Sequence, residues 1–140
     1  MSRQISAASE TASAATSASA GPSAATAGLP VYKVRKKFLK LFKAHDVLVI
    51  CGATGSGKST QLPKFLHAAK LLGAHGKMVG ITQPRRVAAV TVAKRVASEL
   101  NSGIGRTVGY AVRFDNCTTA ATRIKYVCQH QEQHASFAAA

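Results

Sequence analysis

The sequence predicts an α/β protein in which a parallel sheet is flanked by helices. A short apolar run at residues 47–51 (VLVIC) is followed by a glycine-rich stretch and by a helical pattern over residues 61–70. Strand-like runs alternate with a helical pattern again further along the chain. Such alternation requires long crossovers, which are the connections that join parallel strands. We expect residues 47–51 to form a buried strand of this sheet.

The first part of the chain predicts a tail and then a basic helix. Residues 1–28 are dominated by Ala, Ser and Thr, so they cannot bury enough apolar area to become ordered. Order is expected to begin at Leu29 and Pro30. Residues 31–43 then place apolar side chains at helical spacing with lysines and arginines between them. This pattern favours an amphipathic helix packed beside the sheet, and a membrane-surface helix is the alternative.

The second half of the chain supplies the remaining elements. Strands are predicted at residues 77–82, which should be buried, at 107–112 and at 122–127, the last with alternating polarity. A helix is predicted over residues 87–100, with Pro84 suited to its first turn. Its apolar face is expected to consist of Val87, Val90, Val92, Val96 and Leu100. Residues 115–119 have the composition of a loop.

The glycine-rich stretch at residues 52–59 (GATGSGKS) fits the phosphate-binding pattern G-x-x-x-x-G-K-S/T. Its glycines allow the backbone to curl so that successive N–H groups converge on phosphate oxygens. The helix that follows adds the partial positive charge of its N-terminus. Lys58 can then reach the β- and γ-phosphates, and the Ser59 hydroxyl can ligand Mg²⁺.

Charge and cysteine content restrict the partners and the compartment. The net charge is +14, and the first 28 residues contribute only Arg3 and Glu10. This surplus indicates a polyanionic partner, and a basic solvated surface without a partner is the alternative. Cys51, Cys117 and Cys128 are odd in number and widely spaced, which indicates a reducing compartment rather than a disulfide framework. We therefore expect the nucleus or the cytoplasm rather than mitochondrial import. Since no apolar run approaches a membrane span, we expect no membrane partner.

Two details concern single side chains. Cys51 closes the apolar run and is expected to be a small buried hydrophobic residue. Cys128, His130 and His134 have the chemistry of metal ligands. A fourth ligand at suitable spacing is missing, however, so residues 128–140 are expected to be a frayed tail.

Several later segments resemble a single family in the same order and spacing. Residues 82–89 (TQPRRVAA) closely resemble motif Ia of the DEAH-box RNA helicases, and residues 108–115 (VGYAVRFD) resemble the segment that follows it. Residues 122–127 (TRIKYV) are similar to the start of motif Ib. The resemblance covers residues 29–127 and implies a phosphate-loop NTPase of the RecA-like type, with an incomplete first helicase domain.

The resemblance also implies roles for particular residues. ATP and Mg²⁺ would be held by Gly52, Gly55, Ser56, Gly57, Lys58, Ser59 and Thr60. Arg95 would stack on the nucleotide base, and its alternative is a solvated helix arginine. The backbone of single-stranded RNA would contact Arg85, Arg86 and, more weakly, Arg113 with Phe114, and Phe114 could equally belong to the core. DNA is not excluded as the strand, and protein activators are possible partners.

The chain departs from the family pattern in three places. Ala53 stands where the family usually has Glu, and motif Ib continues as Cys128-Gln-His130 rather than Thr-Asp-Gly. The Asp-Glu-Ala-His motif is missing. The only acids of the chain are Glu10, Asp46, Glu99, Asp115 and Glu132, and none follows an apolar strand as a Walker B carboxylate must.

These departures leave the enzymatic status open, and no catalytic residue is assigned. The chain is expected to bind nucleotide and RNA without useful hydrolysis. It is either a fragment of an active helicase, from a frameshift or truncated gene model, or a non-catalytic binding module. Motif Ia argues against another phosphate-loop protein, such as a small kinase or GTPase. Since residues 47–50 would lack neighbouring strands, we also expect low stability of the isolated chain.

Overall fold

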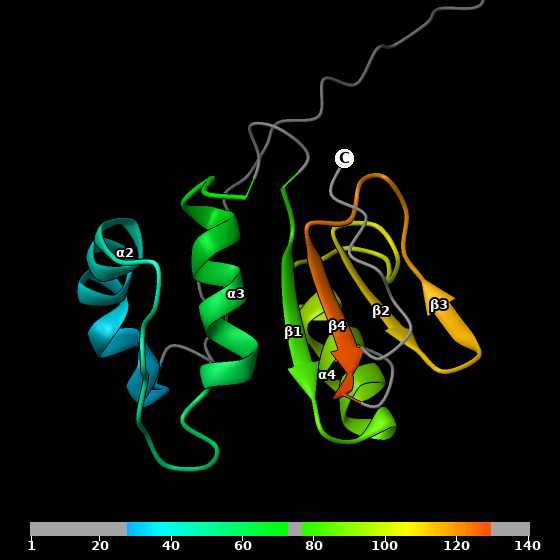
Figure 1. Cartoon of the computed structure of the whole chain (residues 1–140), viewed down its shortest axis with the longest axis horizontal. Helices are drawn as coiled ribbons and strands as arrows, with labels where there is room; N and C mark the ends of the chain where they lie inside the picture. Colours follow the sequence, from blue (N-terminus) through cyan, green and yellow to red (C-terminus); the bar gives the residue numbers. More distant parts are fainter. Residues whose placement is uncertain (1–27, 73–76, 130–140) are drawn as a thin grey trace, which may run out of the picture.

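The computed structural model describes residues 28–72 and 77–129, and the part of the chain within these ranges forms two layers of helices beside a sheet (Figure 1). The predicted N-terminal tail and most of the predicted C-terminal tail, with His130 and His134, lie outside the described residues. In chain order the elements are η1 (Pro30–Val34), α2 (Arg35–Ala44), α3 (Lys58–Ala68), β1 (Val79–Gln83), α4 (Arg86–Glu99), β2 (Val108–Val112), β3 (Asp115–Cys117) and β4 (Ile124–Cys128).

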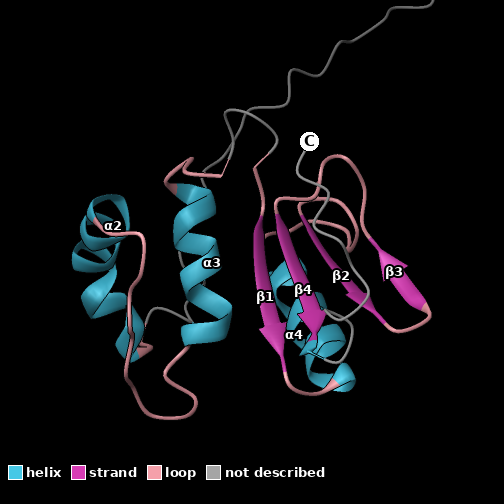
Figure 2. Ribbon diagram, in the orientation of Figure 1, coloured by secondary structure: helices cyan, strands magenta, loops and turns pink. Residues whose placement is uncertain are grey.

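The sheet has four strands in the order β1-β4-β2-β3, and the predicted parallel pairing is confirmed for three of them. β4 lies between β1 and β2 and runs parallel to both, so that Ile124 is aligned with Val79 on one side and with Val108 on the other. Helix α4 covers one face of this sheet (Figure 2). The alternating pattern predicted for β4 is also confirmed, because Ile124 and Tyr126 are fully buried.

The expectation of a loop at residues 115–119 was wrong for its first part. β3 pairs antiparallel with β2, and Val112 is aligned with Asp115 across a two-residue connection. Phe114 in that connection has φ of 64°, a conformation that bulky side chains rarely adopt. The usual Asn-Gly or Asp-Gly hairpin signal is absent there, so the polar composition of β3 suggested a loop.

Helix α4 confirms the helix predicted at residues 87–100, but of the expected apolar face only Val96 is fully buried. Val87 is 75% exposed, whereas Ala89, Ala93 and Val96 are completely buried. Small alanine side chains allow the helix to lie close to the sheet. Pro84 precedes the helix by two residues, so it does not occupy the first turn as expected.

β1 was expected to be fully buried, yet its residues alternate between half-buried and exposed. The reason is its position at the edge of the sheet, where β4 is its one partner among the described strands. The start of α2 is preceded by the short helix η1, and together they confirm the basic helix predicted at residues 31–43. α2 and η1 pack against α3, where the rings of Tyr32 and Phe65 meet edge to face at 5.0 Å.

The buried strand expected at residues 47–51 is not formed, and this prediction was wrong. These residues have no strand conformation, and Val47 and Val49 are 80% and 87% exposed. Cys51 is exposed as well, contrary to expectation. A strand requires hydrogen-bonding neighbours, and no described strand pairs with this run. Among the described residues, no helix is long and apolar enough to cross a membrane.

Candidate nucleotide and nucleic-acid site

The loop at residues 52–57 has the backbone geometry that its glycines permit. Gly55 and Gly57 have φ of 78° and 93°, which side-chain-bearing residues rarely adopt. Gly57 is also the residue immediately before α3. A Cβ on Gly57 would lie 3.1 Å from Leu29 and Val31, so the close approach of η1 also requires a glycine here.

Lys58 lies over this loop. Its ammonium donates to the carbonyl oxygens of Gly52 at 2.6 Å and Ala53 at 2.8 Å, and to the Ser56 hydroxyl at 3.2 Å. These three acceptors match the three protons of the ammonium. The lysine is therefore held at the N-terminal end of α3, where the helix also presents unpaired N–H groups. Both features favour an anion such as a phosphate.

The first turn of α3 is attached to the centre of the sheet. The hydroxyl of Tyr126 on β4 donates to the backbone carbonyl of Ser59 at 2.8 Å, while the Ser59 side chain is exposed. Burial and, to a lesser degree, the charge of Glu99 raise the pKa of Tyr126 well above its ordinary value. The tyrosine hydroxyl therefore keeps its proton and remains a donor to this turn.

A buried glutamine links the loop to helix α4. Gln61 is fully buried and donates to Thr60 Oγ1 at 3.1 Å and to Glu99 Oε2 at 2.9 Å. It accepts a hydrogen bond from the Tyr32 hydroxyl at 2.9 Å. Thr60 Oγ1 in turn donates to the carbonyl of Gly57 at 3.3 Å. The loop, η1, α3 and α4 therefore share one polar network.

Glu99 is the centre of this network. Lys64 contacts its carboxylate at 2.8 Å and Arg95 at 3.0 Å. Burial by itself raises the pKa of Glu99, but the hydrogen bonds from its three donors and the Lys64 charge outweigh it and hold the pKa below its ordinary value. The Arg95 side chain is 62% exposed, so its guanidinium is oriented by Glu99 yet accessible to solvent.

The sequence predicted the loop and the arginines of this site but not Gln61, Glu99 and Tyr126 as its supports. Their contacts join residues 38 or 67 positions apart, which a local pattern does not reveal. The one available signal was polarity, because Gln61 lies on a helix face that is otherwise apolar.

Three exposed arginines lie where parallel strands end. Arg85 and Arg86 follow β1, and Arg113 follows β2. Since β1 and β2 both run parallel to β4, their carboxyl ends share one edge of the sheet. The loop ahead of α3 lies at the same end of the molecule (Figure 1). Phe114 is 88% exposed with the Arg113 guanidinium 4.8 Å from its ring centre, so a place in the core is excluded.

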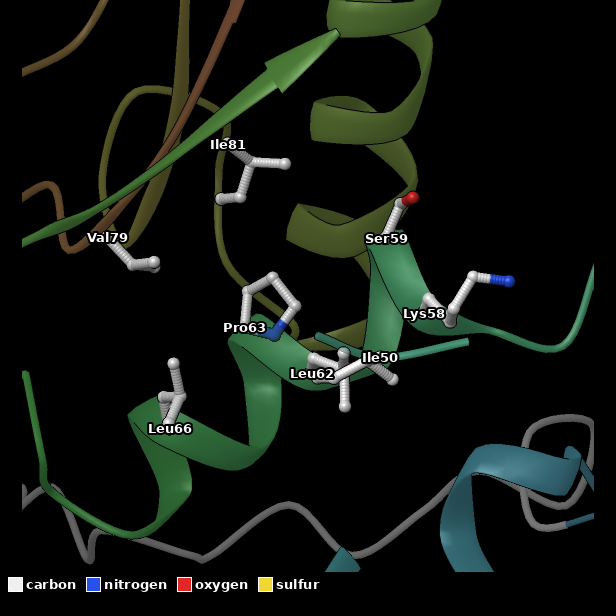
Figure 3. A pocket seen from close by; sticks show the side chains of 8 residues that line it. All are labelled: Ile50, Lys58, Ser59, Leu62, Pro63, Leu66, Val79 and Ile81. Carbon is white, nitrogen blue, oxygen red and sulfur yellow. The ribbon is translucent and has the colours of Figure 1, made fainter. Parts of the chain in front are cut away.

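An apolar hollow of about 310 Å³ lies between α3 and the free edge of β1. Figure 3 shows Lys58 and Ser59 together at one side of it, with Val79 and Ile81 across from Pro63 and Leu66. Ile50, from the exposed run at residues 47–51, also lines it. Such walls suit the burial of apolar side chains rather than of a phosphate.

Carboxylates are scarce around the loop. Within residues 28–72 and 77–129 the acids are Asp46, Glu99 and Asp115, and Glu99 is engaged by Lys64 and Arg95. Those same ranges contain no group of three His, Cys, Asp or Glu residues that could hold a metal ion. Ser59, the second residue of α3, is exposed beside the loop.

Comparison with known proteins gives a consistent picture, although no protein-family model matches the chain. It is 54% identical over 99 residues to the pre-mRNA-splicing factor ATP-dependent RNA helicase DEAH10 of Arabidopsis thaliana, and 54% identical over 101 residues to the ATP-dependent RNA helicase DHX33 of Drosophila melanogaster. It is 49% identical over 102 residues to the probable ATP-dependent RNA helicase DHX40 of Homo sapiens.

These matches cover 71% to 73% of the chain but only 13% to 14% of the relatives, so the chain spans about one seventh of their length. A matched segment of about 100 residues in a chain of 140 necessarily includes the glycine-rich loop and the arginines after β1. Over this segment the chain belongs to the DEAH-box ATP-dependent RNA helicases.

Proposed function

We propose that residues 29–127 are part of the ATP-binding domain of an ATP-dependent RNA helicase, with a RecA-like phosphate-loop fold. Residues 1–28 are a tail in this proposal. Cys128, which was predicted to begin a frayed tail, is instead the buried last residue of β4. The observation that supports the proposal most strongly is the loop ahead of α3. There Gly57 is in the left-handed conformation, and the Lys58 ammonium is held beside the loop at the N-terminus of α3, where a phosphate group can bind.

In this proposal the loop binds the phosphates of ATP. Backbone N–H groups of residues 52–60 and the N-terminus of α3 face the phosphate oxygens, and Lys58 exchanges its contacts with the loop carbonyls for contacts with the β- and γ-phosphates. The Ser59 hydroxyl ligands Mg²⁺, which neutralises phosphate charge when bound. Tyr126 keeps this turn in place through the Ser59 carbonyl.

Arg95 is proposed to stack on the nucleotide base. Its guanidinium is exposed, yet Glu99 restricts its position through the ion pair at 3.0 Å. A planar cation can lie on a base without reading its identity closely. The same carboxylate is bonded to Gln61, which contacts Thr60 of the loop. The base-contacting and phosphate-contacting groups therefore share one support.

The sheet edge formed by Arg85, Arg86 and Arg113 is proposed to contact the backbone of single-stranded RNA. Phosphate contacts without base readout suit a protein that moves along any sequence. Phe114 beside Arg113 offers an exposed ring on which a base can stack. None of these proposed contacts distinguishes RNA from DNA, so we expect single-stranded RNA and single-stranded DNA both to bind.

The chain by itself is proposed to bind ATP and RNA without turnover, because its sequence holds no Asp-Glu-Ala-His motif and no other carboxylate placed to activate water. A full helicase would couple hydrolysis to movement along RNA. The alternative is a binding module that acts without catalysis. We place either form in the nucleus or the cytoplasm.

The test is a calorimetric titration of the 140-residue chain with ATP and Mg²⁺. We expect Lys58→Ala to weaken binding by about tenfold to a hundredfold, since hydrogen bonds to charged groups contribute about 1.5–3 kcal/mol. Lys77→Ala is the matched control, because this exposed lysine precedes β1, at the opposite end of the sheet from the loop (Figure 1). Circular dichroism checks that both variants keep their helices.

Phosphate release with and without RNA completes the test. We expect no turnover above that of Lys58→Ala, with or without RNA. RNA-stimulated hydrolysis that disappears in Lys58→Ala would show that the chain is an enzyme on its own. Equal ATP affinity of the wild type and Lys58→Ala would instead show that the loop does not bind the nucleotide.

A further inference from the structure

Helix α2 and the turn before it carry a continuous row of lysines on one side. At 3.6 residues per turn, Lys36, Lys37, Lys40 and Lys43 fall within an arc of about 120°. All four are exposed, and so is Lys33 in η1. We call these five residues the lysine face. It extends along the helix for about 10 Å from Lys36 to Lys43.

The opposite side of this helix is occupied by the protein itself. Val31 and Phe38 are buried, and the Arg35 guanidinium lies 5.3 Å from the ring centre of Phe65 on α3. Val34 and Phe42 remain partly exposed, at 45% and 41%. A helix that binds a membrane surface must turn its apolar side to the lipid. Since that side is packed against α3, the lysine face is better suited to a polyanion in solution than to a membrane surface.

The lysine face also lacks the acids that normally accompany basic residues on a surface. No acidic residue occurs in η1 or α2. Among the described residues, the ion pairs are those of Glu99 with Lys64 and Arg95, so none involves the lysine face. Lysines three or four positions apart repel one another, and cations near a helix N-terminus are unfavourable. A bound polyanion relieves both penalties.

We propose that the lysine face binds the phosphate backbone of single-stranded RNA, as a contact surface separate from the sheet edge. α3 lies between α2 and the sheet, so the lysine face and the arginines after β1 and β2 are on different parts of the molecule (Figure 1). At about 3.4 Å per nucleotide of a stacked strand, its length matches about three phosphates. The inference rests on the proposed function in that it takes RNA as the partner.

The experiment compares two triple variants that lose the same charge. Lys36→Gln/Lys37→Gln/Lys40→Gln alters the lysine face, and Lys70→Gln/Lys77→Gln/Lys94→Gln removes three exposed lysines elsewhere. Fluorescence anisotropy measures the affinity for a labelled uridine homopolymer at several KCl concentrations. Each lost phosphate contact lowers the slope of log affinity against log salt concentration by about 0.7. We expect the slope to fall by about two for the first triple and to stay near that of the wild type for the second.

A third variant, Arg85→Gln/Arg86→Gln, separates this inference from the proposed function. If it leaves RNA affinity unchanged while the lysine-face triple abolishes salt-dependent binding, the sheet edge fails as an RNA contact and the lysine face stands. Equal slope changes in the two lysine triples would overturn the inference, because bulk charge alone would then explain binding. Loss of binding to phosphatidylserine vesicles but not to RNA in the lysine-face triple would also overturn it.

Discussion

Two apolar runs that both end in cysteine differ completely in their structure. Residues 47–51 (VLVIC) are irregular and, apart from the partly buried Leu48, exposed, with Val49 87% accessible. β4, Ile124–Cys128 (IKYVC), is the more polar of the two, yet Ile124 and Tyr126 are fully buried. The difference lies in their neighbours. β4 has a parallel partner on each side and helix α4 against one face, whereas no described strand pairs with residues 47–51.

Apolar composition therefore favours burial, but it does not by itself supply the strands and side chains against which a run can pack. A strand becomes ordered when its N–H and C=O groups find partners in adjacent strands and its side chains find a packed layer. Ile50 lines the hollow beside β1, and Leu48 is partly buried against the core, so the run has a few contacts although no described strand pairs with it. Burial and pairing are therefore properties of the surroundings of a run, and substitutions in the two runs should have very different effects.

The largest expected difference comes from truncating one side chain in each run. Ile124→Ala should destabilise the folded state by about 2–5 kcal/mol, because it leaves a cavity in the centre of the sheet. Val49→Ala should change the free energy of unfolding by less than about 0.5 kcal/mol, since its side chain is already in water. Urea unfolding followed by circular dichroism measures both. Sucrose is added to all samples, because we expect low overall stability and excluded osmolytes favour the folded state.

The two cysteines provide an independent check on the same comparison. Cys51 is exposed and Cys128 is buried, so a thiol reagent should modify Cys51 in the folded chain and Cys128 only after unfolding. A large stability loss in Val49→Ala together with slow labelling of Cys51 would mean that residues 47–51 are packed in solution. The contrast between the runs would then be wrong.

The same contrast explains which parts of the fold were predictable. The alternation of β4 and the helical period of α4 are local patterns, and both elements formed close to their expected bounds. The apolar composition of residues 47–51 is equally clear, but composition shows only what a segment can do and not whether it finds partners. For β3 the error was the reverse: its polar Asp-Asn-Cys sequence predicted a loop, and only the pairing with β2 makes it a strand.

Two glycines, one in a central strand and one in an edge strand, differ in the space around them. A Cβ on Gly109 of β2 would collide with the carbonyl oxygen of Cys117 and lie 2.9 Å from the methyl group of Thr118. Gly109→Ala should therefore destabilise by about 1–3 kcal/mol, as overpacking does. Gly80 of the edge strand β1 has no atom within 4 Å of the added Cβ, so Gly80→Ala should stabilise by about 0.4–1 kcal/mol. Thermal and urea unfolding of the two variants measure the difference.

The two stability changes distinguish the packed centre of the sheet, at Gly109, from its outer edge, at Gly80. If Gly80→Ala destabilises as much as Gly109→Ala, then something covers the edge of β1 in solution. If both are neutral, β3 does not lie as close to Gly109 as described. The pair is informative because the chemical change is identical and only the surroundings differ.

The site shows a similar division between local and distant information. The loop at residues 52–59 and the arginines at strand ends follow from short motifs, because phosphate binding depends on consecutive backbone groups. The supports of the site are different. Gln61, Glu99 and Tyr126 act through partners on other elements, so a sequence window around any of them contains no sign of the contact.

The smallest expected effect tests the hydrogen bond between Tyr126 of β4 and the first turn of α3, where the proposed ATP site begins. Tyr126→Phe removes only the hydroxyl that donates to the Ser59 carbonyl, so it should cost about 0.5–1.5 kcal/mol of stability. Because this turn begins the proposed ATP site, ATP affinity should also fall, by about twofold to tenfold. Tyr110→Phe is the matched control. It removes a hydroxyl that donates to Asp115 at 3.0 Å, away from the loop, and should leave ATP affinity unchanged.

The pH dependence of this effect has a definite sign. The pKa of Tyr126 is raised in the folded state, so its contribution to stability is complete below the unfolded pKa of about 10 and declines as the pH rises above it. Tyr126→Phe lacks this titration, and the stability difference between wild type and variant should therefore shrink above about pH 10. The idea fails if the stability difference between wild type and Tyr126→Phe stays constant above about pH 10 and Tyr110→Phe lowers ATP affinity equally. The Tyr126 hydroxyl would then not connect β4 to the first turn of α3. A difference that shrinks as expected would make Tyr126 the physical link by which β4 holds the first turn of α3, where the proposed ATP site begins.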